Sequence, residues 1–384
     1  MENQEKKKLR EALLTTVKQQ IRTYPVYTAK MKLKYRIKQC LGKKQAPIDR
    51  FFWPHAMLSY ALMEAHKVTG STEALAALTE YVDRYMQAGV PLYYVDNVMN
   101  GEALLYLHRQ TGKPEYLQVA EKLARYVQEN GNATRAYMRE KGLEAVYDGS
   151  LIYRSGNPTH VYVDALGMVC PMLTHIGVMQ KKDDRESAEQ TVESSLAYLQ
   201  NFMEKAMDAV SGLPYHGYDM VSGEKMGIIG WGRAVGWLLM ALSGSLQYVS
   251  KEAYAGEAAK DSELFGAVEA LTKQFEELVK TTFSYQKEDG LFAWQLQATE
   301  GPADTSATAM ILYAVKQGMQ SGALSEEYRA MVEKGEQGLL CHVRDGNVKQ
   351  CLAECMGFAQ YPQVYGCYPW GLAMTAAVLF MDEK

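Results

Sequence analysis

The most constraining feature of the sequence is an alternation between helices that are apolar almost all round and helices that carry one charged face. The first kind predicts burial on nearly every side. It occurs near residues 53–68, 97–111, 163–180, 231–250, 305–319 and 370–382. The second kind predicts an outer position, and it occurs near residues 4–22, 72–88, 114–130, 184–207, 260–281 and 325–340. Six inner and six outer helices predict an all-α fold, an (α/α)6 barrel of six helical hairpins, with one domain over residues 1–384.

A weak internal repeat supports the hairpins. Residues 66–75 match residues 108–117, and in each copy an apolar helix ends at a Thr-Gly turn and a more polar helix begins. Gly70 and Gly112 suit the position after a helix C-terminus, and Pro114 suits a first helical turn. The repeating unit is therefore a helical hairpin, and neighbouring hairpins bury their apolar members together.

The hairpin order gathers the starts of the inner helices at one mouth. If successive helices alternate in direction, the inner ones run parallel, and the long connections near 131–159, 208–230, 282–304 and 341–369 fall at the same end. Long loops and converging polar groups mark a ligand site. The candidate substrate-binding residues at this mouth are His55, Asn97, His160, His216, Trp231, Arg233, Trp237, Ser306 and Trp370.

Composition excludes several other classes of protein. A net charge of −4 gives no general attraction to nucleic acid or to a membrane surface. The basic stretch 30–44 is interpreted as a solvated face, and no run reaches the ~18 apolar residues that a membrane span needs. The highly charged N-terminus lacks a signal-type core, and six cysteines form no disulfide framework, so we expect a cytoplasmic protein with free thiols. Cys351 and Cys355 match no standard zinc spacing, so we expect neither metal nor cofactor; the oligomeric state stays open.

Two carboxylates begin inner helices and are the candidate catalytic residues. Asp164 stands where a polar loop becomes an apolar helix, and Asp96 precedes another inner helix. Each alone suits a structural role, because an acid at a helix start satisfies free N–H groups and the helix dipole. If the two face each other, like-charge repulsion and partial burial raise the pKa of one, and the pair can serve as general acid and base.

Arg233 is the least expected residue on structural grounds. A cation in the first turn of a helix faces the positive end of the dipole, which costs roughly 0.3–1 kcal/mol. A bound carboxylate would explain it, and so would a pairing with a loop acid such as Asp219 or Glu224. Trp231 and Trp237 flank Arg233 and suit either a stacking wall for a sugar ring or ordinary core packing. His216, in a loop with glycine and tyrosines, suits a polar contact or a local turn.

These elements together resemble a known family. The matching pieces are Val95-Asp96-Asn97, Val163-Asp164-Ala-Leu-Gly-Met168 with Pro171, Leu213-Pro-Tyr-His216-Gly-Tyr-Asp219, Trp231-Gly-Arg233-Ala-Val-Gly236-Trp237, Asp289-Gly-Leu-Phe, Thr305-Ser306-Ala-Thr-Ala-Met310 and Tyr368-Pro-Trp370-Gly371. In this order, from about residue 50 to the end, they resemble the unsaturated glycuronyl hydrolases of glycoside hydrolase families 105 and 88. Family 105, the unsaturated rhamnogalacturonyl hydrolases, is the more similar of the two.

The resemblance implies an (α/α)6 barrel and a metal-free reaction on small oligosaccharides that end in an unsaturated uronic acid. It implies that Asp164 protonates C4 and activates the water that adds at C5, after which the hemiketal opens and releases the remaining sugar. Asp96 would hold or polarise the pair, Arg233 and His216 would contact the sugar, and the two tryptophans would shape the pocket. Ala234-Val235 replaces the usual Gly-Asn of the family, which predicts one polar contact fewer at the mouth.

Two other functions fit the same helical pattern. An inverting glycosidase on intact glycans would need a second carboxylate roughly 6.5–9.5 Å from the first, with a water between them. A non-catalytic sugar-binding toroid would need neither acid. Loss of the conjugated double bond of a lyase product would distinguish an unsaturated glycuronyl hydrolase from these two other functions.

Overall fold

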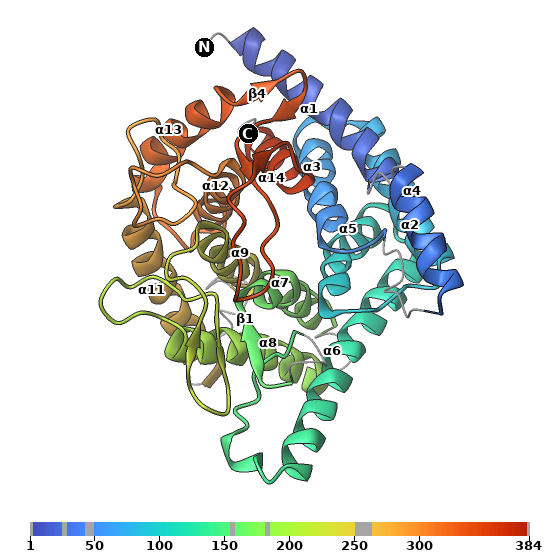
Figure 1. Cartoon of the computed structure of the whole chain (residues 1–384), viewed down its shortest axis with the longest axis vertical. Coiled ribbons are helices and arrows are strands. Elements are labelled where there is room, and N and C mark those ends of the chain that lie inside the picture. The colour runs from blue at the N-terminus through green and yellow to red at the C-terminus, as the bar shows by residue number, and fades with distance from the viewer. Residues whose placement is uncertain are drawn as a thin grey trace.

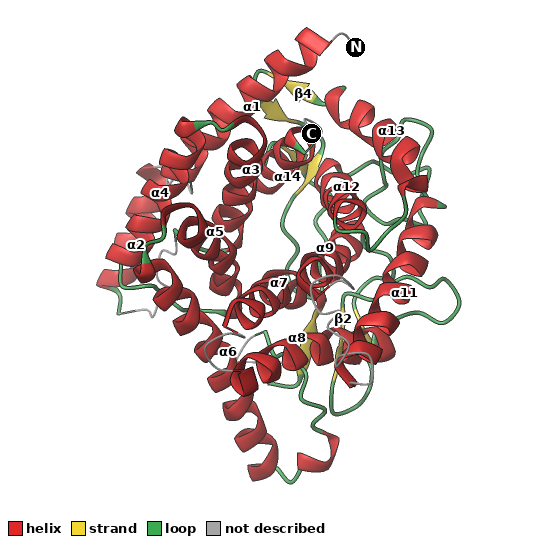
Figure 2. Cartoon of the chain, turned by 180° about the vertical axis from the view of Figure 1, so that it is seen from behind, coloured by secondary structure: helices red, strands yellow, loops and turns green. Residues whose placement is uncertain are grey.

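The computed structural model describes residues 3–24, 29–42, 50–153, 158–180, 185–249 and 263–381. Its centre is a closed ring of inner helices (Figures 1 and 2). The ring consists of α3 (Trp53–Thr69), η1 (Val95–Asn100) continued by α5 (Gly101–Thr111), α7 (Val163–Gln180), α9 (Gly232–Val249), α12 (Thr305–Gln320) and α14 (Pro369–Phe380). Each contacts the next in this order, and α14 packs against α3, so the ring closes.

In the described part of the chain, an outer layer of helices surrounds this ring (Figure 2). They are α1 (Asn3–Thr23), α4 (Thr72–Gln87), α6 (Pro114–Glu140), α8 (Arg185–Lys205), α11 (Glu263–Phe283) and α13 (Arg329–Leu340). Helix α1 packs on α3 and α14, α4 on α3, α6 on α5, α8 on α7, α11 on α9 and α13 on α12. The predicted (α/α)6 barrel is therefore confirmed, with its more apolar helices inside.

Two cavities at opposite ends of the ring show that the inner helices run parallel. One is lined by residues from helix starts, among them Trp53 of α3 and Asp164 of α7. The other is lined by residues from the C-terminal halves of the same helices and of α9, among them Lys67, His175 and Tyr248. The starts of the inner helices therefore meet at one mouth, as the sequence predicts, and they direct the positive ends of their dipoles toward it.

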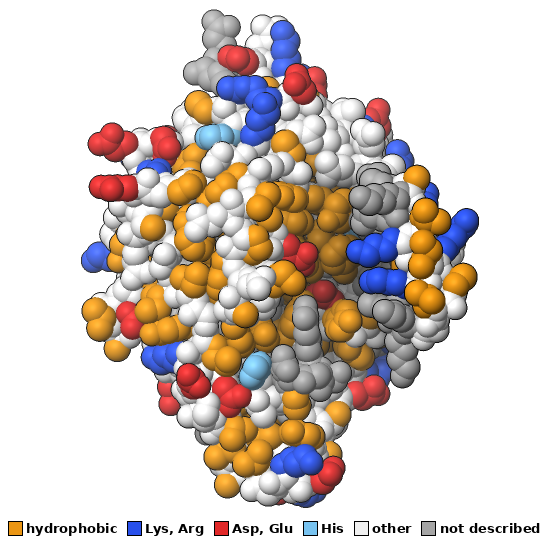
Figure 3. All heavy atoms as spheres, viewed as in Figure 1, with side chains coloured by type: hydrophobic (Ala, Val, Ile, Leu, Met, Phe, Trp, Pro, Cys, Tyr) orange, Lys and Arg blue, Asp and Glu red, His pale blue; other side chains and the backbone are white. Residues whose placement is uncertain are grey.

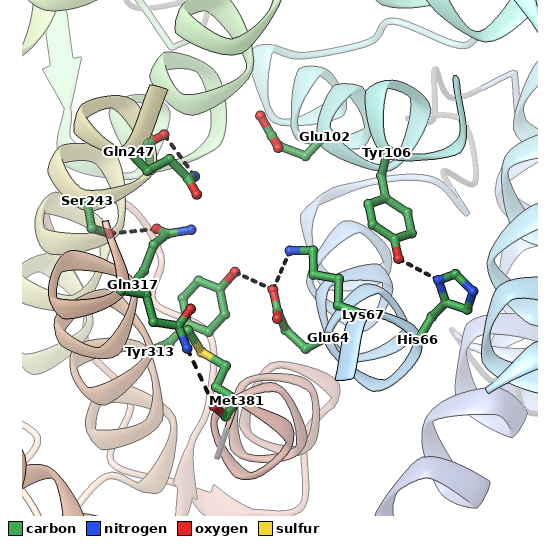
Figure 4. A network of polar contacts seen from close by, with 12 residues as sticks. Glu64, His66, Lys67, Glu102, Tyr106, Ser243, Gln247, Tyr313, Gln317 and Met381 are labelled. Carbon is green, nitrogen blue, oxygen red and sulfur yellow. Dashed lines mark hydrogen bonds and ion pairs between the residues drawn. The ribbon is translucent and has the colours of Figure 1, made fainter. Parts of the chain in front are cut away.

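A polar network closes the end opposite the mouth (Figure 4). Glu64 accepts hydrogen bonds from Lys67 at 2.7 Å and from Tyr313 at 3.2 Å, and Glu102 accepts one from Tyr248 at 3.1 Å. The Glu64–Tyr313 bond joins α3 to α12, and the Glu102–Tyr248 bond joins α5 to α9, so these contacts connect inner helices in pairs.

The repeated turns confirm the hairpin prediction. Gly70 and Gly112 both adopt left-handed backbone conformations, with φ of 67° and 71°, and their N–H groups bond to the carbonyls of His66 and His108. Pro114 occupies the first turn of α6. The two copies therefore end an inner helix and start an outer one in the same way.

Several helix boundaries differ from the predictions. The second inner helix begins as the 3-10 turn η1, because the side chain of Asn97 bonds back to the chain before it, and α6 continues to Glu140 instead of ending near 130. The segment predicted as a helix near 325–340 begins with the 3-10 turn η4 (Glu326–Tyr328). The predicted limits at 184, 250, 260 and 382 lie outside the described residues.

Helix α2 (Ala29–Cys40) was not predicted, because basic residues at almost every second position obscure its helical spacing. Lys32, Lys34, Arg36 and Lys38 are exposed, which confirms a solvated basic face, while Lys43 and Lys44 lie outside the described residues. Among the helices that the structure describes, none is long and apolar enough to cross a membrane.

Short antiparallel strands build the rim of the mouth. β1 (His160–Tyr162) pairs with β2 (Gly217–Asp219), which pairs with β3 (Lys225–Met226). β4 (Val343–Arg344) pairs with β5 (Asn347–Val348), and β6 (Cys351–Leu352) pairs with β7 (Tyr365–Gly366). The short 3-10 turn η2 (Glu144–Val146) precedes β1. The segment between β6 and β7, residues 353–364, passes in front of the inner helices in Figure 1 and is called the C-terminal flap below.

Candidate active site

The cavity at the mouth is formed by the N-terminal parts of α3, α7 and α9, by β1, by the residue before β2 and by the C-terminal flap. In Figure 3 the same face is hollowed near its centre, with hydrophobic side chains around the hollow and acidic side chains within it. The lining residues are Trp53, Tyr153, Tyr162, Asp164, Met168, His216, Trp231, Arg233, Trp237, Glu354, Cys355 and Gly357. Five of the residues singled out from the sequence, namely Asp164, His216, Trp231, Arg233 and Trp237, therefore share one cavity.

Asp164 and His216 are placed together by the pairing of β1 with β2. Asp164 lies in the first turn of α7, which begins at Val163 directly after β1. His216 directly precedes β2, and the Val163 N–H donates to the His216 carbonyl at 3.0 Å. Gly217 has no room for a side chain, because a Cβ there would meet the backbone of Val161 and the ring of Phe358. The backbone pairing therefore fixes both residues before their side chains meet.

The side chains of Asp164 and His216 form a hydrogen-bonded pair. Nε2 of His216 lies 2.7 Å from Oδ2 of Asp164, and Nδ1 of the same ring lies 2.8 Å from the hydroxyl of Tyr361. The His216 side chain is only 1% exposed, whereas that of Asp164 is 17% exposed. The carboxyl group therefore faces the cavity, and the imidazole supports it from within the protein.

Aromatic rings form the wall around this pair. Trp231 lies 4.6 Å from the ring of His216, and Trp237 meets Trp53 edge to face at 6.1 Å. Trp237 can lie this deep because Gly167 of α7 leaves room, since a Cβ there would meet the indole at 2.6 Å. Both indoles are buried and also line the cavity, so each belongs both to the core and to the cavity wall.

Arg233 is held by the protein on several sides. Its guanidinium donates to the carbonyls of Leu352 and Ala353, both at 2.8 Å, and lies 3.6 Å from Asp304. It also lies over the ring of Trp231, 4.8 Å from the centroid. The pairing partner is thus Asp304, not the loop acids Asp219 or Glu224 that the sequence suggested. Arg233 joins α9 to the start of the C-terminal flap and still reaches the cavity.

Asp96 lies beside the cavity rather than on its lining. It is buried in η1, which packs against α7, and its Oδ2 accepts a hydrogen bond from Tyr153 at 3.4 Å. Tyr153 itself lines the cavity. The link from Asp96 to the cavity therefore passes through a phenol, and the predicted raised pKa of one of the two aspartates stays a prediction.

Two predicted contact residues support the backbone behind the mouth. His55 is 1% exposed, and its Nε2 lies 2.6 Å from the carbonyl of Tyr24. Burial lowers the pKa of His55 to about 4, so the imidazole is neutral at pH 7. Asn97 accepts hydrogen bonds from the N–H groups of Tyr93 and Tyr94 through its amide oxygen. Neither His55 nor Asn97 lines the cavity.

The other three predicted contact residues also lie off the cavity lining. Ser306 donates to Asp304 at 2.6 Å in the first turn of α12, and Trp370 donates its indole N–H to the Leu352 carbonyl at 3.1 Å. His160 lies on β1, with its Nε2 3.4 Å from Asp219. Ser306 and Trp370 are buried and support Arg233 and its partners, whereas His160 is part of the outer rim.

The sequence prediction missed the contribution of the C-terminal flap. Glu354, Cys355 and Gly357 line the cavity, and Phe358 stacks on Tyr162 with centroids 3.9 Å apart and planes at 7°. Burial raises the pKa of Cys355 to about 12, and the nearby Asp164 acts in the same direction, so the thiol is neutral. The only signal in the sequence was the length of the connection near 341–369, which did not indicate which side chains point inward.

Position 235, where the family usually has asparagine, is fully buried. Val235 is 0% exposed and does not line the cavity, so its side chain packs into the core of the ring instead of facing the mouth. Within the described segments, no group of three or more His, Cys, Asp or Glu side chains is arranged to hold a metal ion. The expectation of a reaction without metal or cofactor stays a prediction.

Comparison with known proteins adds the following matches. The family model described as Glycosyl Hydrolase Family 88 matches residues 26–381. Over 332 residues the chain is 26% identical to the unsaturated rhamnogalacturonyl hydrolase YesR of Bacillus subtilis (strain 168), covering 84% of this chain and 87% of that protein.

Two solved structures share the fold over nearly the whole chain. A possible member of the GH105 family from Klebsiella pneumoniae subsp. pneumoniae MGH 78578 superposes with a TM-score of 0.77 and 16% identity, covering 99% of this chain and 93% of the other. An unsaturated glucuronyl hydrolase specific for heparin superposes with a TM-score of 0.66 and 14% identity, covering 99% and 97%.

Proposed function

The chain belongs to glycosyl hydrolase family 88, and on that premise we propose that it removes the terminal unsaturated uronic acid from small oligosaccharides left by polysaccharide lyases. The observation that carries the proposal is the Asp164–His216 pair at the rim of an aromatic-walled cavity. YesR, a relative over most of the chain, is named an unsaturated rhamnogalacturonyl hydrolase. Rhamnogalacturonan fragments are therefore the first substrates to test.

The reaction is the hydration of the C4=C5 double bond. Asp164, in its carboxylic acid form, gives its proton to C4, and the π electrons of the double bond form the new C4–H bond. Positive charge at C5 is shared with the ring oxygen. Asp164, now a carboxylate, takes a proton from the water that adds at C5, so one residue serves as acid and then as base.

The hydrated product then breaks down in two further steps. The hydrate is a hemiketal at C5, and its opening gives a ketone at C5 and a hemiacetal at C1. Collapse of that hemiacetal releases the rest of the oligosaccharide as an alcohol, so one water is consumed in total. No nucleophilic displacement at C1 takes place, in contrast to the mechanism of most glycosidases.

The mouth suits an anionic sugar in two ways. The starts of α3, α7 and α9 direct positive dipole ends into the cavity, and the Arg233 guanidinium lines it, so a uronate carboxylate meets positive potential. Trp231 and Trp237 offer faces for the sugar ring, and Asp96 acts through Tyr153 at one side of the cavity.

The proposal also covers the domain organisation, the location in the cell and the partners of the protein. The whole chain forms one catalytic domain, which the closure of the ring between α3 and α14, near opposite ends of the sequence, supports. The protein is cytoplasmic, which six cysteines without disulfides support. Its partner is the oligosaccharide, with no nucleic acid or membrane involved.

The test is the ultraviolet absorbance of unsaturated oligosaccharides prepared with pectin and glycosaminoglycan lyases. Hydration removes the conjugated double bond, so the absorbance falls with time for the correct substrate. Release of saturated sugars of inverted anomeric configuration from intact glycans, with the absorbance of the lyase products unchanged, would instead establish the inverting glycosidase. Binding of sugars without turnover would instead indicate a non-catalytic sugar-binding toroid.

A further inference from the structure

Tyr361 reaches the active-site histidine from the C-terminal flap, 145 residues away in the sequence. Its hydroxyl lies 2.8 Å from Nδ1 of His216 and accepts a hydrogen bond from the Ile228 backbone N–H at 3.3 Å. Its ring packs edge to face on Trp231, with centroids 5.3 Å apart. Burial raises the pKa of the Tyr361 phenol above its ordinary value, so the hydroxyl keeps its proton at neutral pH.

The backbone around Gly227 is shaped for this contact. Gly227 has a φ of +85°, which side chains rarely tolerate, and a Cβ there would lie 2.5 Å from the Tyr361 hydroxyl and 2.6 Å from the His216 Cβ. The missing side chain lets the flap tyrosine, the histidine and the next backbone N–H meet at one point.

The donors and acceptors at Tyr361 restrict the proton of His216. A phenol hydroxyl has one proton to donate and lone pairs that accept, and the Ile228 N–H can only donate. Among the described residues, Nδ1 of His216 is the only acceptor hydrogen-bonded to this hydroxyl. In a neutral imidazole, the Tyr361 hydroxyl can donate its proton to Nδ1 only if Nδ1 carries no hydrogen. The single ring proton of His216 then lies on Nε2.

The position of that proton decides which oxygen of Asp164 is occupied. A proton on Nε2 points at Oδ2, 2.7 Å away, so Oδ2 accepts and cannot also carry the acidic proton there. The opposite tautomer would leave Nε2 bare, and it would draw the proton of Asp164 to Oδ2, away from the cavity. No other group in the described residues bonds to the remaining oxygen, Oδ1.

We propose that Tyr361 is a positioning residue that fixes His216 in the Nε2–H tautomer and so keeps the reactive proton of Asp164 on Oδ1. The tautomer follows from the contacts alone, whereas its use in catalysis rests on the proposed function. When Oδ1 protonates C4, the new carboxylate is stabilised at once, because the Nε2–H bond to Oδ2 strengthens as negative charge develops. The same bond orients the carboxylate for taking the proton of the incoming water.

The first experiment reads the tautomer without any substrate. The chain has seven histidines, so ¹⁵N-histidine labelling with His216→Gln as the assignment control identifies the His216 signals. At a pH where the ring is neutral we expect a protonated Nε2 and a bare Nδ1 in the wild type, and a mixture of both tautomers in Tyr361→Phe. A protonated Nδ1 in the neutral wild-type ring, or an unchanged tautomer in Tyr361→Phe, overturns the proposal.

The second experiment reads catalysis, with Tyr365→Phe as the matched control. Tyr365 lies four residues along the chain, and its hydroxyl is buried with no hydrogen-bond partner among the described residues. We expect Tyr361→Phe to lower kcat by about 10- to 100-fold with KM little changed and with an altered pH profile, because a mispositioned proton acts on the chemical step. Tyr365→Phe should keep both parameters and the profile.

The two experiments separate the possible failures. If the wild-type protein turns over no unsaturated uronide, the proposed function is wrong, but the result on the His216 tautomer is unaffected. If the wild-type protein is active and Tyr361→Phe has an equal kcat and an unchanged pH profile, Tyr361 has no role in catalysis. The proposed function is then unaffected. A raised KM with unchanged kcat would show that Tyr361 only shapes the pocket.

Discussion

The carboxyl group of Asp164 and the imidazole of His216 lie 2.7 Å apart, although 52 residues separate them in the chain. The pairing of β1 with β2 brings their backbones together, and the start of α7 directs the carboxyl group to the cavity. The partners are unequal, because the histidine is enclosed and the acid is accessible. That inequality is what a proton donor to substrate requires, since the acid must reach the ligand while its support stays fixed.

Asp164→Asn should abolish the loss of the double bond. The amide matches the carboxyl group in size, so the helix start stays intact, but it cannot give or take the proton. We expect kcat to fall by about 10²- to 10⁴-fold, with an unchanged melting temperature within a few degrees. The absorbance assay measures the first, and circular dichroism the second.

Asp96→Asn is the matched comparison for Asp164→Asn. Because Asp96 meets the cavity through Tyr153, its replacement should leave measurable turnover. An inactive Asp96→Asn beside an active Asp164→Asn would mean that the two roles are exchanged.

Glu354→Gln distinguishes hydration from inversion. Glu354 is a second carboxylate at the cavity, supplied by the C-terminal flap. Hydration uses one acid and base, so the variant should keep kcat within about 10-fold on unsaturated substrates. An inverting enzyme would depend on both carboxylates, and its activity on intact glycans would be lost in Glu354→Gln as completely as in Asp164→Asn.

Arg233→Lys tests whether the guanidinium serves the fold or the ligand. Lysine carries the charge but cannot make the two parallel bonds to the Leu352 and Ala353 carbonyls, so the free energy of unfolding in urea should fall by about 1–3 kcal/mol. Arg233→Met should cost more, about 3–5 kcal/mol, because it leaves the buried Asp304 without a countercharge. Wild-type stability in Arg233→Lys, together with a KM raised more than tenfold, would assign Arg233 chiefly to the substrate carboxylate.

The sequence predicted the ring of helices and five of the twelve residues that line the cavity, for a definite reason. Helical spacing reports which side of a helix is apolar, so it located α3, α7 and α9 and with them the carboxyl and indole groups of Asp164, Trp231 and Trp237. It reports nothing about a loop that returns over the mouth, and Glu354 and Tyr361 were therefore missed. Helical spacing also cannot distinguish a side chain at a helix start that faces the cavity from one that points away from it. His55 and Ser306 were for this reason predicted as substrate-binding residues.

His55 should make stability depend on pH between about 4 and 6.5. Its pKa is about 4 in the folded protein and 6.5 when exposed, because burial disfavours the charged ring. Between these values the unfolded chain binds a proton that the folded chain does not, so stability is fully present above pH 6.5 and falls as the pH is lowered toward 4. The full effect is about 3 kcal/mol.

The measurement for His55 compares two proteins at two pH values. His55→Gln keeps a side-chain N–H for the Tyr24 carbonyl but has no titrating group. The loss in free energy of unfolding from pH 7 to pH 4.5 should be about 2–3 kcal/mol smaller in this variant than in the wild type. Equal losses in both proteins would show that His55 is protonated in the folded state.

Gly227→Ala should damage catalysis more than stability, and Gly223→Ala provides its control. Both glycines have positive φ, +85° and +70°, so both variants carry a similar backbone strain of about 1 kcal/mol. A Cβ at residue 223 meets nothing within 4 Å, whereas a Cβ at residue 227 would push Tyr361 and His216 apart. We therefore expect a shift in the urea midpoint for both variants, larger for Gly227→Ala because of the crowding there, and a fall in kcat of about tenfold or more only for Gly227→Ala. Equal kcat in the two variants would mean that the flap tyrosine and the histidine tolerate separation, and the contact between them would then be a feature of packing alone.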